Sequence, residues 1–173
     1  AGLPYLVHAE LDSGEATHIK ITNRYQDFLD SRPHSFETNA IKHLIQLAEE
    51  TRCRVHVVHL SSAEAIPMIA EARQSNIPVS VETCPHYLCL EAEAIDDGQT
   101  VFKCCPPIRE HSNRLALWEG LRQGHIDMIV SDHSPCTPDL KLLEEGDLDK
   151  AWGGISSLQF SVSLMLTEAN GTV

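Results

Sequence analysis

The 173-residue sequence is poor in positive charge and has no long apolar run. It holds 13 Lys and Arg residues against 25 Asp and Glu residues, a formal net charge of -12. Such an acidic chain repels nucleic-acid phosphates and anionic lipids. No apolar segment approaches the ~20 residues that a membrane-spanning helix needs. The sequence therefore predicts no nucleic-acid partner and no membrane partner.

Disulfide-rich secreted domains are a second class that the sequence does not fit. The six cysteines lie inside apolar or motif-like segments and lack the even spacing of a disulfide scaffold. The first four residues also lack the basic and apolar regions of a signal peptide. We expect reduced thiols in a soluble, intracellular protein. The 42% hydrophobic content suffices for one globular domain.

Short apolar runs alternate along the chain with helical patterns. The runs cover residues 5–8, 55–60, 78–83 and 126–130. They are nearly continuous in apolar residues, as expected of strands buried on both faces of a parallel sheet. Parallel strands are joined by crossover helices, so the sequence predicts an α/β fold in a single domain.

Helices are predicted between these runs. One apolar stripe extends over residues 36–51. Ser61 and Glu64 fit a capping box for a second helix that ends near residue 75, with Pro67 in its second turn. A third helix carries Leu115, Trp118 and Leu121 on one face and ends at Gly124. Residues 86–100 are expected to be irregular.

Ligand-type side chains follow three of the predicted strands. His8, His59 and Asp132 stand at or just after the carboxyl ends of apolar runs, where α/β proteins place their functional residues. We expect the three side chains to converge on a metal ion. A single histidine in such a place is more often a hydrogen-bonded core residue. His56 is expected to be structural, and His133 is expected to point away from the site.

Five segments occur in the order typical of a known family. They are residues 7–10 (VHAE), 58–62 (VHLSS), 82–87 (ETCPHY), 106–109 (PPIR) and 131–135 (SDHSP). Together they resemble the cyclic amidohydrolases, which include allantoinases, dihydroorotases and hydantoinases. Residues 82–87, 132–135 and 152–155 (WGGI) are most similar to allantoinases.

The resemblance implies a TIM-like (β/α)8 barrel with two divalent metals, usually zinc, at the carboxyl ends of its strands. His8 and His59 match the ligands on strands five and six, and Asp132 matches the aspartate of strand eight. The remaining ligands would be a His-x-His pair and a carboxylated lysine that bridges the two ions. The resemblance also implies a homo-oligomeric parent enzyme.

The sequence departs from this family in length. It has no His-x-His before His8 and no room for the bridging lysine, and a complete barrel needs ~250 residues. We therefore predict that residues 1–173 form the carboxyl-terminal half of the barrel, an incomplete domain. The isolated chain is expected to be inactive.

The resemblance also assigns roles around the substrate, a small cyclic ureide. Asp132 is the expected catalytic residue, which accepts a proton from water and returns it to the leaving ring nitrogen. His86, Cys105, Arg109 and Gly153 are candidate substrate-binding residues. Alternatives remain for two of them: Arg109 could instead pair with Glu110 or Glu119, and Gly153 could serve a simple turn. A zinc knuckle at Cys84, His86 and Cys89 is disfavoured, because it lacks a fourth ligand nearby.

The predicted reaction of the parent enzyme is hydrolysis of allantoin to allantoate. Hydantoinase, dihydropyrimidinase or dihydroorotase activity is the alternative within the family. A non-catalytic truncated product that associates through exposed sheet edges is the alternative outside it.

Overall fold

A four-stranded parallel sheet forms the centre of the computed structural model, which describes residues 2–14 and 19–172. The strands pair in chain order: β1 (Tyr5–Val7), β2 (Val55–Val57), β3 (Val79–Thr83) and β4 (Met128–Ile129). Each strand lies inside one of the four apolar runs. The predicted α/β fold with a parallel sheet is therefore confirmed.

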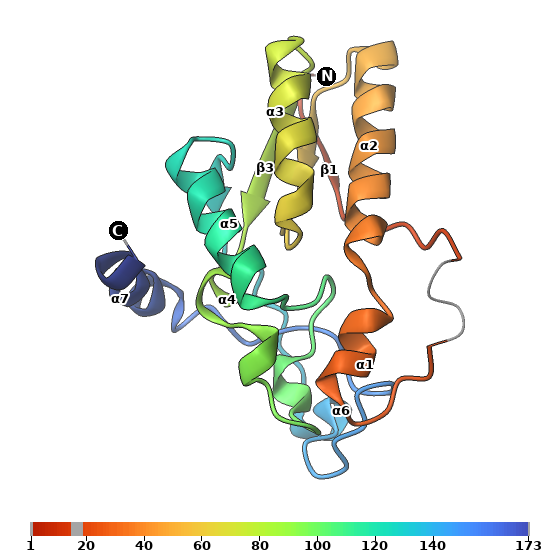
Figure 1. Ribbon diagram of the computed structural model, residues 1–173, viewed down its shortest axis with the longest axis vertical. Helices are drawn as coiled ribbons and strands as arrows, with labels where there is room; N and C mark the ends of the chain where they lie inside the picture. The colour runs from red at the N-terminus through yellow and green to blue at the C-terminus, as the bar shows by residue number, and fades with distance from the viewer. Residues whose placement is uncertain (1, 15–18, 173) are drawn as a thin grey trace.

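Helices connect the strands and cover one face of the sheet. They are α2 (His34–Thr51) before β2, η1 (Ala63–Ala65) and α3 (Ile66–Gln74) before β3, and α5 (His111–Arg122) before β4. Figure 1 shows α2 and α3 side by side in front of the strands. None of the helices among the described residues has both the length and the apolarity to span a bilayer.

Shorter elements gather beyond the carboxyl ends of the strands, in the lower half of Figure 1. They are α1 (Tyr25–Asp30), α4 (Pro85–Cys89), η2 (Ala92–Ala94), η3 (Thr100–Phe102) and α6 (Pro138–Lys141). The last helix, α7 (Ser161–Thr172), packs against α4. Residues 86–100, expected to be irregular, thus hold part of α4 and the whole of η2. The sequence did not predict α1, which is too short to show a helical period.

The start of the second crossover helix differs from the prediction. Ser61 does not cap it, because the Ser61 hydroxyl donates to the Pro107 carbonyl at 2.6 Å and no side chain caps η1 or α3. Pro67 lies in the first turn of α3. A proline there loses no helical hydrogen bond, since first-turn N–H groups have no partner within the helix.

Burial differs between the inner and outer strands. All of β2 is buried, whereas Tyr5 and Leu6 of β1 are 66% and 62% exposed and both residues of β4 are exposed. The prediction of strands buried on both faces was wrong for β1 and β4. Each outer strand has a neighbour on one side only, so its apolar side chains remain accessible within the described chain.

Helix α5 ends as predicted, and its predicted apolar face is confirmed in part. Gly124 follows the helix with φ +71°, the left-handed conformation that glycine adopts without strain. Leu115 is exposed, whereas Trp118 and Leu121 are partly buried against the core, and the helix fully buries Leu117 and Gly120. A Cβ atom at position 120 would lie 2.6 Å from the Ile66 side chain, so glycine allows α5 to approach α3 closely.

Candidate metal and active site

The carboxyl ends of all four strands carry ligand-type side chains. His8 directly follows β1, His59 lies two residues after β2, Cys84 directly follows β3, and Asp132 lies three residues after β4. Because the strands are parallel, these positions share one end of the sheet. The topology therefore brings together residues that are far apart in the sequence.

His8 and His59 are in direct contact. His8 Nδ1 lies 3.0 Å from His59 Nε2, and the two rings are 4.8 Å apart between their centroids. One nitrogen of this pair must carry the proton and the other must accept it. The two imidazoles thus converge at the distance expected of neighbouring groups that share one site.

His59 and Asp132 have the same unusual backbone conformation. Their φ angles are +41° and +42°, a region that non-glycine residues seldom adopt and that is found at functional sites. Burial lowers the pKa of His59, and the adjacent His8 lowers it further, against the opposing charge of Asp132. His59 is therefore a neutral imidazole at pH 7, the form that binds metal ions.

Cys84, His86 and Asp132 form a second group at the same end of the sheet. Their potential ligand atoms all lie within 4.8 Å of one another, and the first two residues are buried. Neither ring nitrogen of His86 has a hydrogen-bond partner among the described residues. Burial, with the neighbouring His59, lowers the pKa of His86 to about 3. His86, predicted to bind substrate, thus lies beside Asp132.

Glu10 belongs to the site, although the sequence assigned it no role. Its Oε2 atom lies 3.1 Å from His8 Nε2 and accepts a hydrogen bond from Arg32 Nη1 at 2.6 Å. Burial raises the pKa of Glu10, but the His8 hydrogen bond and the charge of Arg32 outweigh burial and hold it below its ordinary value. The one available signal was its position two residues after His8. Glu10 and His8 line an open hollow of about 460 Å³.

A buried ion pair holds the loop that carries His59. Glu37 of α2 accepts hydrogen bonds from the backbone N–H groups of Ser61 and Ser62 at 2.9 and 3.0 Å. Its other carboxylate oxygen binds Arg109 at 2.8 Å, and both side chains are at most 2% exposed. Glu37 was not predicted, because a glutamate in an amphipathic helix is usually exposed.

The observed ion pair of Arg109 differs from the alternative pairing that the sequence suggested. Its partner is Glu37, not Glu110 or Glu119. The Arg109 guanidinium also donates to the Arg32 carbonyl at 3.2 Å. Its donors thus face the protein interior, and Arg109 supports the His59 loop from behind.

Two further predicted substrate residues lie against each other. A Cβ atom at Gly153 would lie 3.1 Å from Cys105 Sγ, so glycine admits this approach. The Lys141 ammonium donates to the carbonyls of Trp152 and Gly154 at 2.9 and 2.6 Å. The loop around Gly153 is therefore held by a buried lysine and is not a simple turn.

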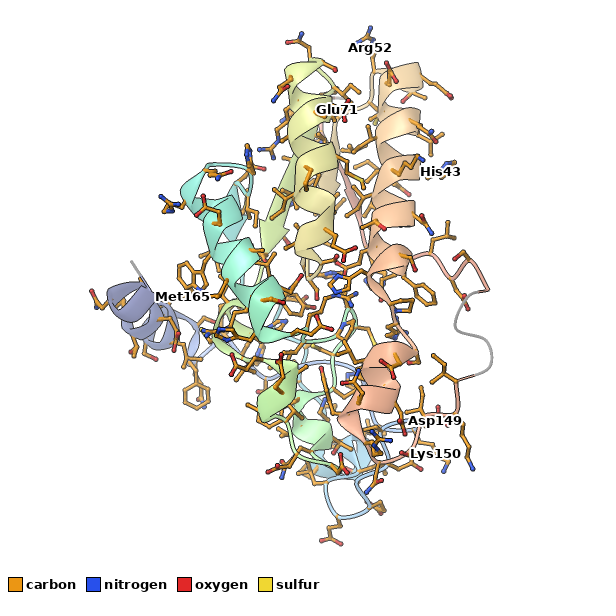
Figure 2. The ribbon with its side chains drawn as sticks, in the orientation of Figure 1. His43, Arg52, Glu71, Asp149, Lys150 and Met165 are labelled. Atoms are coloured by element: carbon orange, nitrogen blue, oxygen red, sulfur yellow. The ribbon has the colours of Figure 1, made fainter. Side chains whose placement is uncertain are left out.

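The remaining histidines near the strands have structural contacts. His56 lies 2.7 Å from Ser80 Oγ and 2.8 Å from Glu82 Oε2, as expected of a structural residue. His133 accepts hydrogen bonds from the backbone N–H groups of Ser157 and Leu158. His43 lies on the outer side of α2, away from the strands (Figure 2).

Known proteins resemble this chain over most of its length, although no family model matches it. The mitochondrial allantoinase of Aquarana catesbeiana is 54% identical over 95% of the chain, and the allantoinase of Saccharomyces cerevisiae is 49% identical over 93%. The chain spans 34% and 35% of these two proteins, about a third of their length.

Solved structures of hydantoinases are also similar to this chain. The L-hydantoinase (dihydropyrimidinase) from Arthrobacter aurescens matches 98% of the chain and 39% of its own length, with a TM-score of 0.87 and 29% identity. The chain is therefore similar to cyclic amidohydrolases over most of its length. The strand-end residues are the natural place to test for a metal.

The residues at the strand ends fit a divalent metal. Two imidazoles and a carboxylate, from His8, His59 and Asp132, offer the nitrogen and oxygen ligands that Zn²⁺ accepts. His59 Nδ1 is buried and lacks a hydrogen-bond partner in the described part of the chain. Buried polar atoms without partners are costly, and a bound cation would compensate them.

Proposed function

We propose that the full-length protein containing this segment hydrolyses allantoin to allantoate. The observation that carries this proposal is the convergence of His8, His59 and Asp132 at one end of a parallel sheet, in a chain 40–54% identical to allantoinases. The four strands would be strands five to eight of a TIM-like barrel. The four remaining strands would come from the rest of the protein.

We assign two zinc ions to the complete site. His8 and His59 would hold one ion, and Asp132 would contribute to the other. A carboxylated lysine and a His-x-His pair outside this chain would complete the set. Zinc held by these residues would supply hydroxide at neutral pH and would polarise the ring carbonyl.

Residues of this chain transfer the proton and contact the substrate ring. The Asp132 carboxylate accepts the proton of the attacking water and returns it to the ring nitrogen as the C–N bond breaks. Burial keeps His59 neutral, so that it does not add a positive charge beside a cation. His86, the Cys105 backbone and Gly153 border the substrate, while Arg109 acts through the His59 loop.

A segment with half of the ligand set should not catalyse the reaction alone. We expect the 173-residue chain to be inactive and the full-length protein, assembled as a homo-oligomer, to be active. Hydantoinase activity is the alternative, since the structural matches include hydantoinases. Rates of the full-length protein on allantoin, hydantoin and dihydrouracil decide between them: faster hydrolysis of either of the last two would contradict the proposal.

Removal of one proposed ligand tests the site itself. His59→Ala in the full-length protein should lower zinc content and reduce hydrolysis by more than about 100-fold, because loss of an outer partner alone costs about 10–100-fold. The matched control is His43→Ala, whose side chain is exposed on α2. Equal zinc content in the two variants would show that His59 does not bind metal.

A further inference from the structure

One group at the strand ends contains a donor that the proposed zinc sites do not use. Cys84, His86 and Asp132 present a sulfur, a nitrogen and an oxygen atom within 4.8 Å of one another. Neither Cys84 nor His86 belongs to the proposed zinc ligands. The group therefore needs its own explanation.

Ordinary core packing does not account for His86. His86 is 4% exposed, and both of its ring nitrogens lack hydrogen-bond partners among the residues that the structure describes. A buried imidazole pays the cost of leaving water and gains no hydrogen bond in return. Beside it, Cys84 is 0% exposed, so its thiol is also turned inward. Both side chains thus direct donor atoms into the group that includes Asp132.

We propose that Cys84, His86 and Asp132 form a binding site for a soft divalent cation such as Cd²⁺. Thiolate ligands favour soft cations over the hard ones that carboxylates alone would select. A sulfur, a nitrogen and an oxygen ligand, with one water, complete a four-coordinate shell. The site rests on the proposed function only in that Asp132 is counted in both ligand sets.

Cation binding at this site changes protonation but not oxidation state. The Cys84 S–H bond breaks, its proton passes to solvent, and the sulfur electron pair forms the bond to the cation. Asp132 is partly buried, whereas Cys84 and His86 are buried. One carboxylate oxygen can bind this cation while the other remains for the neighbouring proposed zinc site.

A spectroscopic titration tests the site without reference to hydrolysis. Cd²⁺ added to the full-length, zinc-loaded protein should produce the ultraviolet charge-transfer absorption of a cadmium–thiolate bond. Cys84→Ser should remove this band and weaken Cd²⁺ binding by more than about tenfold, since even outer partners contribute that much. Cys89→Ser is the matched control, because Cys89 is a partly buried thiol in α4 outside the group.

A second variant keeps the test valid if Cys84→Ser fails to fold. His86→Asn should retain the thiolate band but require more than about tenfold more Cd²⁺ to develop it. The absence of a band in the wild-type protein, or an unchanged band and affinity in either variant, would overturn the proposal. A protein that shows the band but does not hydrolyse allantoin would support this site and contradict the proposed function.

Discussion

The two histidines that meet at the end of the sheet are held in different ways. His59 lies on an inner strand end, is 8% exposed, and belongs to a loop bound by the buried Glu37–Arg109 pair. The His8 side chain is 49% exposed and follows an outer strand, with Glu10 as its orienting carboxylate.

This difference indicates that the two sides of the site contribute differently to stability and to metal affinity. The His59 loop is built into the core, since Asn113 also accepts from the Ala63 N–H and donates to the Ser61 carbonyl, both at 2.8 Å. Among the described residues, His8 is oriented by the Glu10 carboxylate and by its contact with His59. We therefore expect changes near His59 to reduce stability first and changes near His8 to reduce metal affinity first.

The largest effect on stability is expected from a substitution in the buried Glu37–Arg109 pair behind His59. Glu37→Gln leaves Arg109 as a buried charge without its counter-ion, which costs about 3–5 kcal/mol of the free energy of unfolding. Denaturant unfolding of the full-length protein measures the loss. Glu49→Gln, an exposed change on the same helix, is the control.

A double variant separates the two tasks of Glu37. Replacing Glu37 and Arg109 together by Met removes the ion pair but still leaves the Ser61 and Ser62 N–H groups without their acceptor. Stability should recover only in part. A full recovery would mean that the loop needs no carboxylate, and a loss below about 1 kcal/mol in Glu37→Gln would contradict the buried pair.

An intermediate effect is expected on the His8 side. Glu10→Gln removes the charge that orients His8, and loss of such a partner typically costs about 10–100-fold in metal affinity. Competition with a chromophoric chelator measures the affinity in the full-length protein. Glu64→Gln, exposed at η1, serves for comparison. If zinc affinity were the same in both variants, Glu10 would have no role in orienting His8.

The smallest effect on stability is expected from a substitution of Tyr25, which supports the region behind His59. The Tyr25 hydroxyl donates to the Ile108 carbonyl and accepts from the Ile108 N–H, both at 3.0 Å, next to Arg109. Tyr25→Phe should cost about 1 kcal/mol. Unfolding curves of Tyr25→Phe and of the wild-type protein at about pH 8 measure the difference.

The same tyrosine predicts a pH dependence. Burial raises the pKa of Tyr25 well above its ordinary value, so above about pH 10 the unfolded chain loses a proton that the folded chain keeps. Stability should therefore fall as pH rises through this range, and Tyr25→Phe should reduce that slope. An identical slope in Tyr25→Phe and the wild-type protein would contradict this assignment.

Much of the fold could be predicted because its signals are local. Each of the four strands falls inside an apolar run, and residues 36–51 differ from the observed α2 by two residues at one end. Helix α1 was not predicted, because six residues are too few to show a recurring helical period of apolar residues. The capping box at Ser61 failed because a tertiary partner, the Pro107 carbonyl, takes its hydroxyl.

The candidate site could be predicted less completely. His8, His59 and Asp132 were found from their positions after apolar runs, and the structure brings them to the same end of the sheet. Glu37 could not be found this way, because its partner Arg109 lies 72 residues away. The group around His86 was equally hidden, since its third member comes from another strand.

The sequence by itself determined the parallel α/β arrangement and the types of ligand after each strand, because periodicity and apolar content act over a few residues. Only the tertiary structure decided which charges are buried together, which histidine is enclosed and which thiol lies beside Asp132. Those outcomes depend on the distances between elements that are far apart in the chain, and desolvation and hydrogen bonding in the packed interior set their energies.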